Sequence, residues 1–124
     1  MAAILAAGKL LKDPWAARND YIQVLLDRND NSVDAFVRAH AKKSLDEEAL
    51  TQLLRLMELQ RHAMLMFTSC GWFFDEVSGI ETNQILQYAN RAIHYAIQVA
   101  EVDLHDEFVS RLEQIPSNVY KNAA

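Results

Sequence analysis

The chain has 124 residues, of which 51% are hydrophobic and 23% charged, the proportions of a soluble globular domain. Its net charge of −5 and the scatter of its basic residues argue against nucleic-acid binding, which needs a concentrated positive patch. No apolar run reaches the roughly eighteen residues of a membrane span, so no membrane contact is expected. The single cysteine excludes an internal disulfide and fits a reducing compartment. These features predict one cytoplasmic domain over residues 1–124, and only three Gly and two Pro favour helices throughout.

The opening of the chain predicts two helices. Residues 2–11 are rich in Ala and Leu, which favour helix. Asp13 followed by Pro14 is a helix start, with Asp as the N-cap and Pro at the first helical position. The helix that follows is expected over 15–26 and to end in the polar turn cluster 27–31. Its predicted core face consists of Trp15, Ile22, Leu25 and Leu26.

The middle of the chain predicts a short helix and then a long one. Ser32 is expected to open the short helix, which fades near Ala41. Its apolar side holds Val33, Phe36 and Val37. Ser44 and Glu47 have the spacing of a capping box, and the long helix after them is expected to reach Phe67. Its stripe is Leu50, Leu53, Leu54, Met57, Met64 and Phe67. Residues 63–67 are apolar all round, which predicts that protein surrounds that end.

The last part of the chain predicts a second long helix and a final shorter one. Ser78 and Glu81 form a second capping-box pattern before a helix over 79–100. The residues that it is expected to bury are Ile85, Ala89, Ala92, Ile93, Ala96 and Ile97. Asp103 is expected to cap the final helix, which Pro116 ends, with a frayed tail after it. The stripe of that helix is Leu104, Phe108, Leu112 and Ile115. The predicted fold is therefore an all-α antiparallel bundle of five or six helices, with a central hairpin of the two longest.

The connection between the two long helices, residues 68–79, has an unusual composition. It holds three consecutive aromatic residues, two adjacent carboxylates, the only cysteine and two glycines. Exposed apolar groups of this size cost roughly 1.5–3 kcal/mol each compared with buried ones. We therefore expect another surface to cover this tip, with Trp72, Phe73 and Phe74 as a docking face or ligand platform. The alternative is a loop that folds back and plugs the end of its own bundle.

Three further patterns could carry chemistry. Asp75 and Glu76 could act as an acid/base pair, but adjacent loop residues usually diverge, so solvated charge is the stronger interpretation. Cys70 precedes Gly and Trp as in a cysteine-protease motif, but too few residues follow it for the required histidine. A buried structural thiol is expected instead.

Two carboxylate–histidine pairs, Glu58 with His62 and Glu101 with His105, lie one helical turn apart. Di-iron bundles use a three-residue spacing and additional inward glutamates. Surface pairs or core hydrogen bonds are therefore expected, and we predict neither a metal site nor a cofactor.

Two strings in the chain resemble a known family: KDPWAARNDYI (12–22) and MELQRHAMLMFTSCGWFFDEVSGIETNQILQYANRAI (57–93). They are similar to the C-terminal helical region of bacterial proteins related to glycoside hydrolase family 57, the α-amylase/α-mannosidase-like group. That region is often described as a domain of unknown function. The likeness covers roughly residues 11–118.

The resemblance implies an accessory domain that packs on a catalytic β/α barrel and helps to line a carbohydrate cleft. In that family the barrel carries the catalytic carboxylates, so no catalytic residue is assigned here. The chain is expected to be a C-terminal fragment, inactive alone, whose partners are the barrel and an α-glucan or oligosaccharide. The residues expected to line the substrate or face the barrel are Ser69, Trp72, Phe73, Phe74, Asp75 and Glu76. The alternative is an independent interaction module that binds a protein, or another copy of itself as a homodimer, through residues 72–74.

Overall fold

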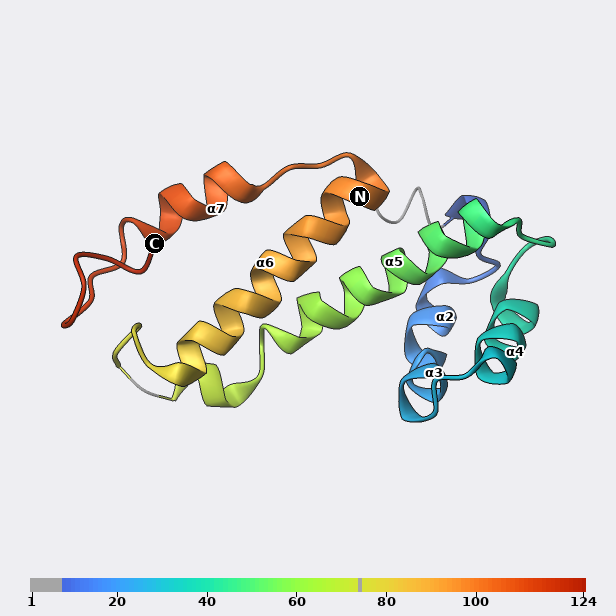
Figure 1. Ribbon diagram of the computed structural model, residues 1–124, viewed down its shortest axis with the longest axis horizontal. Helices are drawn as coiled ribbons and strands as arrows, with labels where there is room; N and C mark the ends of the chain where they lie inside the picture. The colour runs from blue at the N-terminus through green and yellow to red at the C-terminus, as the bar shows by residue number, and fades with distance from the viewer. Residues whose placement is uncertain (1–7, 74) are drawn as a thin grey trace. The chain divides into compact units, whose positions relative to one another are not determined.

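The computed structural model describes residues 8–73 and 75–124, and all the regular secondary structure within them is helical. The all-α prediction is confirmed, and the two longest helices are the two that were expected. The α-helices are α2 (Pro14–Asp20), α3 (Ile22–Leu26), α4 (Asp30–His40), α5 (Glu47–Leu65), α6 (Ile80–Ala100) and α7 (His105–Leu112) (Figure 1). The predicted helix over 2–11 lies mostly outside the described residues. The part of it that is described includes residues 8–10, which are helical.

The chain forms two compact units. The first contains residues up to 57 together with 98–100, and the second contains 58–97 and 101–124. Both α5 and α6 contribute to each unit. No helix in the described part of the chain is long and apolar enough to cross a membrane.

The first unit packs α2, α3 and α4 together. The Asp13 carboxylate accepts hydrogen bonds from the Trp15 and Ala16 amides at 3.0 and 3.2 Å, so the predicted N-cap is confirmed. Tyr21 and Phe36 meet edge to face, with ring centroids 5.6 Å apart. Among the described residues, the largest fully buried side chains all belong to this unit: Leu11, Val24, Leu53 and Leu56.

The predicted core face of 15–26 is wrong. The side chains of Trp15, Ile22, Leu25 and Leu26 are all exposed. The buried positions are Ala17, Tyr21 and Val24, which follow the same helical spacing on the opposite side. Both sides of segment 15–26 carry an apolar stripe. The buried stripe is the one that contains Tyr21, whose ring packs against Phe36.

Helix starts differ from the expected ones where a nearby side chain is a better cap. The short helix begins at Asp30, and Ser32 is not its first residue but the partner of Asn29 in a capping box. The long helix α5 starts directly after Asp46, whose carboxylate accepts a hydrogen bond from the Ala49 amide at 2.8 Å. The predicted box of Ser44 with Glu47 is therefore wrong.

The start of α6 also differs. Its N-cap is Gly79, which makes no side-chain cap, so the predicted pairing of Ser78 with Glu81 is wrong. The Ser78 amide instead donates to the Glu76 carboxylate at 3.0 Å. At the other end, Glu101 adopts the left-handed conformation (φ 54°) and closes the helix.

The second unit contains the end of α5, most of α6, α7 and the tail. Its buried residues include four from the predicted α6 stripe: Ile85, Ala89, Ala92 and Ile93. The end of α5 is not surrounded by protein as expected, because Met64 and Phe67 are exposed. Three more residues predicted to be buried, Ile97, Leu104 and Ile115, are also exposed. The final helix stops at Leu112, before Pro116.

Candidate functional site

The candidate site is the aromatic tip, which we define as residues 67–76 of the second unit. Phe74 lies outside the described residues. The tip begins where α5 tightens: the Met66 amide donates to His62 O four residues back, whereas Phe67 and Thr68 donate to carbonyls three residues back. A 3₁₀ turn, Ser69–Trp72, follows. This tighter winding turns the chain sharply within a few residues.

Gly71 anchors the 3₁₀ turn on α6. A Cβ atom at this position would lie 1.9 Å from Ile85 Cγ1, far inside the contact distance of two carbon atoms. The glycine is thus required for close approach rather than for an unusual φ. Because Ile85 is buried, it has little room to move. The turn is therefore held against a rigid surface.

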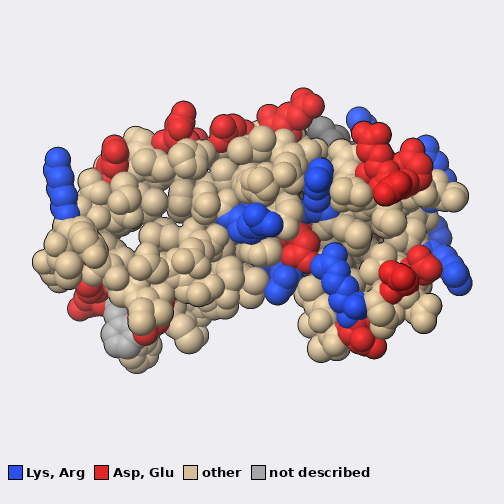
Figure 2. Space-filling model, in the orientation of Figure 1, with Lys and Arg blue, Asp and Glu red and all other residues tan. Residues whose placement is uncertain are grey.

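The three rings of the tip that the structure describes are exposed to solvent. Phe67 and Trp72 stack in parallel planes, with centroids 6.5 Å apart and an angle of 6°. Their exposed fractions are 68% and 67%, and that of Phe73 is 79%. The alternative in which the loop plugs its own bundle is therefore wrong for Trp72 and Phe73. In Figure 2, the surface around the connection between α5 and α6 is tan with acidic atoms among it and no basic ones.

Glu76 ties the tip to the C-terminal tail. Its carboxylate accepts hydrogen bonds from the Ser117 hydroxyl at 2.6 Å and from the Asn118 amide at 2.8 Å. With the Ser78 amide at 3.0 Å, these donors stabilise the ionised form and lower the pKa of Glu76 from 4.5 to about 2, with the Ser117 hydroxyl as the largest cause. The predicted frayed tail is therefore wrong at Ser117 and Asn118.

Asp75 and Glu76 do not form an acid/base pair. Glu76 is engaged with the tail, and a carboxyl whose pKa is about 2 stays ionised and is a poor general acid near neutral pH. Asp75 is exposed, as is Ser69. Solvated charge, the stronger interpretation of Asp75, agrees with its exposure.

Cys70 is exposed, so the prediction of a buried thiol is wrong. In the 3₁₀ turn it is the neighbouring Gly71 that faces α6, which leaves the cysteine side chain toward solvent.

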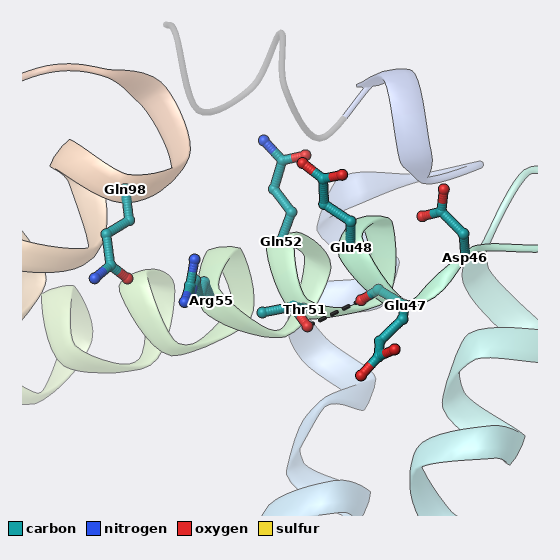
Figure 3. A pocket seen from close by; sticks show the side chains of 7 residues that line it. All are labelled: Asp46, Glu47, Glu48, Thr51, Gln52, Arg55 and Gln98. Atoms are coloured by element: carbon teal, nitrogen blue, oxygen red, sulfur yellow. Dashed lines mark hydrogen bonds between the residues drawn. The ribbon is translucent and has the colours of Figure 1, made fainter.

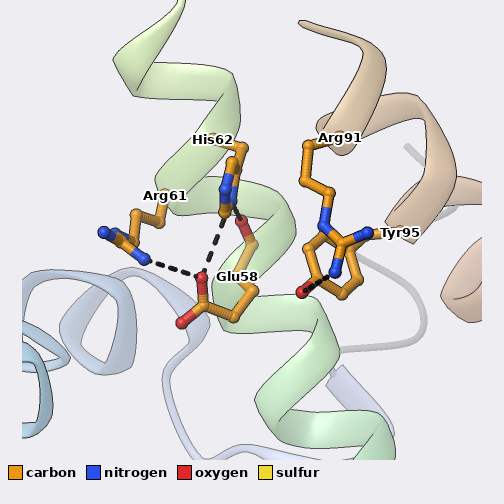
Figure 4. Close-up of polar contacts among 5 residues, drawn as sticks. All are labelled: Glu58, Arg61, His62, Arg91 and Tyr95. Carbon is orange, nitrogen blue, oxygen red and sulfur yellow. Dashed lines mark hydrogen bonds and ion pairs between the residues drawn. The ribbon is translucent and has the colours of Figure 1, made fainter. Parts of the chain in front are cut away.

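A polar cluster lies on α5, before the chain reaches the tip (Figure 4). The buried Glu58 carboxylate pairs with Arg61 at 3.1 Å and lies 3.6 Å from His62 Nδ1. His62 Nδ1 also lies 2.8 Å from the Glu58 carbonyl oxygen, and the His62 ring approaches Tyr95 of α6 with centroids 5.7 Å apart. Glu58 and His62 do meet as expected, but the hydrogen bond joins the ring to the Glu58 main-chain carbonyl, and the carboxylate lies at ion-pair distance. The Arg61 member of the cluster could have been found from the three-residue spacing, whereas Tyr95 could not.

The second expected pair does not form, because His105 approaches Asp106 instead of Glu101. Within the described residues, no group of three or more metal-binding side chains converges on one point.

The chain also has hollows away from the tip. In the second unit, a hollow of about 430 Å³ lies among α5, α6 and α7. Four alanines in its wall leave this space: Ala63, Ala89, Ala92 and Ala96. In the first unit, a polar hollow of about 590 Å³ lies at the start of α5 (Figure 3). Its acidic lining residues are Asp46, Glu47 and Glu48. The tip is the only one of these three features that presents exposed rings.

The chain belongs to a family described as a domain of unknown function (DUF3536), whose model matches residues 4–124. This agrees with the coarser part of the resemblance, which pointed to a helical domain of unknown function. No curated protein and no solved structure matches the chain.

Proposed function

We propose that this chain is an accessory helical domain of a cytoplasmic bacterial enzyme of the glycoside hydrolase family 57 type. The aromatic tip docks on the catalytic barrel and helps to line its carbohydrate cleft. The domain itself holds no catalytic residue and hydrolyses no glycoside alone.

The observation that supports this proposal is the exposure of Trp72 and Phe73 on a turn fixed by Gly71. Flexible loops lose entropy when they bind, whereas a turn already packed on a helix loses little. Large aromatic side chains held in this way are typical anchors of recognition surfaces. The link to carbohydrate comes from the resemblance of residues 12–22 and 57–93 to the family-57 helical region.

Trp72 is the ring best suited to touch sugar. Indole offers the largest flat apolar face of any side chain, and sugars present apolar C–H faces that pack on such rings. Phe67 stacks against Trp72 and restricts the orientations open to the indole. In this arrangement Phe73 contacts the barrel, and Trp72 lies at the rim of the cleft, where the barrel covers part of the ring and a bound sugar packs on the rest.

The test is a Trp72→Ala substitution in an enzyme that joins this domain to a family-57 barrel. We expect kcat/KM for an α-glucan to fall about tenfold, as loss of an interface anchor worth about 1.4 kcal/mol would produce. The melting temperature of the isolated domain should stay unchanged, because the ring is exposed there.

The matched control is Trp15→Ala, which removes the other tryptophan, also exposed but in the first unit. It should leave kcat/KM as it is. Equal activity of the Trp72→Ala and wild-type enzymes would refute the cleft-lining role.

A further inference from the structure

The aromatic tip is small for a specific interface. An aromatic side chain has about 150–250 Å² to bury, so the three rings of the tip that the structure describes, each exposed by about two-thirds or more, offer roughly 300–500 Å². Stable protein interfaces need about 800 Å² from each partner. If the tip docks as proposed, more surface must take part beside it.

The tail is the segment that lies next to the tip. Ser117 and Asn118 are hydrogen-bonded to Glu76, three residues after Phe73. In Figure 1 the tail and the connection between α5 and α6 lie at the same end of the second unit. The two residues that follow, Val119 and Tyr120, are each 67% exposed.

The shape of the tail depends on Glu76 through a chain of hydrogen bonds. The Ser117 hydroxyl donates a hydrogen bond to the Glu76 carboxylate, so the lone pairs of the hydroxyl oxygen can accept from other donors. The amides of Val119 and Tyr120 donate to that oxygen at 3.2 and 3.1 Å, which closes a serine turn. The carboxylate thus fixes the hydroxyl, and the hydroxyl fixes the turn that carries the two apolar side chains.

We propose that Val119 and Tyr120 are a second part of the docking face, and that Glu76 is the positioning residue that holds them beside the aromatic tip. The occupant is the catalytic barrel, so this inference rests on the proposed function. The enlarged face combines Trp72, Phe73, Val119 and Tyr120. Between its two parts lies the Glu76 carboxylate, hydrogen-bonded to Ser117 and Asn118.

The positioning role is tested on the isolated chain by amide hydrogen exchange. Glu76→Gln replaces one carboxylate oxygen by an NH₂ group, which in either orientation faces a backbone N–H, that of Asn118 or that of Ser78, and cannot accept a hydrogen bond from it. We expect exchange at Asn118, Val119 and Tyr120 to rise about tenfold or more, since charge-assisted hydrogen bonds are the stronger kind. Ser117→Ala should accelerate Val119 and Tyr120 but affect Asn118 less.

The matched control is Asp75→Asn, which removes the neighbouring exposed carboxylate and should change none of these rates. Unchanged exchange of the tail in Glu76→Gln would overturn the positioning role, whatever the tip does.

The docking role is tested by hydroxyl-radical footprinting of the isolated chain and of the enzyme that joins it to the barrel. We expect both Trp72 and Tyr120 to become at least threefold less reactive in the enzyme. Protection of Trp72 with unchanged Tyr120 would overturn the role of the tail and leave the proposed function standing. Unchanged reactivity of both residues would overturn the proposed function as well.

Discussion

Gly71 decides how closely the aromatic tip approaches α6. A methyl group at this position would overlap Cγ1 of Ile85. The Ile85 side chain is buried and branches at Cβ, next to the overlapping atom. Overpacking of this kind typically costs about 1–3 kcal/mol. We predict that Gly71→Ala lowers the free energy of unfolding by that amount, measured by urea denaturation.

Gly8→Ala is the control for this substitution. Gly8 is helical and has open space around the position of a Cβ. Alanine there should stabilise the chain by about 0.4–1 kcal/mol through reduced chain entropy. Equal effects of the two substitutions would contradict the close packing of the tip.

Glu76 makes the stability of the hydrogen bonds between the tip and the tail depend on pH. Its folded pKa of about 2 lies below the ordinary value of 4.5, so its contribution is complete above pH 4.5. The contribution falls as the pH drops from 4.5 toward 2. We predict that the stability difference between wild type and Glu76→Gln shrinks over that range, measured by urea denaturation at several pH values. A difference that stays constant between pH 6 and pH 2 would show that the carboxylate charge does not hold the tail.

The same residue shows where sequence reasoning ends at this scale. The composition of residues 68–79 was enough to select the tip, because three adjacent rings cannot all be buried within one short turn. The tail partners of Glu76, Ser117 and Asn118, lie about forty residues further along the chain. Nothing local in the sequence signals such a hydrogen bond.

At the scale of helices, local signals identified one cap and missed others, and they did not decide every buried face. The Asp13–Pro14 start is confirmed because the cap needs only the amides of the next residues. The core face of 15–26 was assigned to the wrong side because both sides are apolar at helical spacing. Only the position of Phe36, from another helix, selects Tyr21 and its neighbours.

This choice of face can be measured within α3. Val24 is fully buried, whereas Leu26, two residues later, is 74% exposed. We predict that Val24→Ala destabilises the chain by about 1–3 kcal/mol and that Leu26→Ala changes its stability by less than about 0.5 kcal/mol. Thermal or urea unfolding of the two variants gives the comparison. The reverse order would mean that α3 buries its other side.

At the scale of the whole molecule, the tip is too small to sustain a homodimer by itself. Its three described rings offer roughly 300–500 Å², below the 800 Å² per partner of a stable interface. We predict that light scattering of the isolated chain gives the mass of a monomer at micromolar concentration. Dimers that grow with concentration and disappear in Phe73→Asp would favour the self-association module instead.

The central claim is that a second protein surface covers the aromatic tip. Acrylamide quenching of Trp72 fluorescence tests it most directly, in a Trp15→Phe background that leaves Trp72 as the one tryptophan of this chain. The Trp72 signal of each form is the difference between that form and its Trp72→Phe variant. The isolated chain should show the strong quenching of a ring that is 67% exposed, and quenching should fall at least threefold when the domain is joined to its barrel. Equal quenching in both forms would contradict the claim.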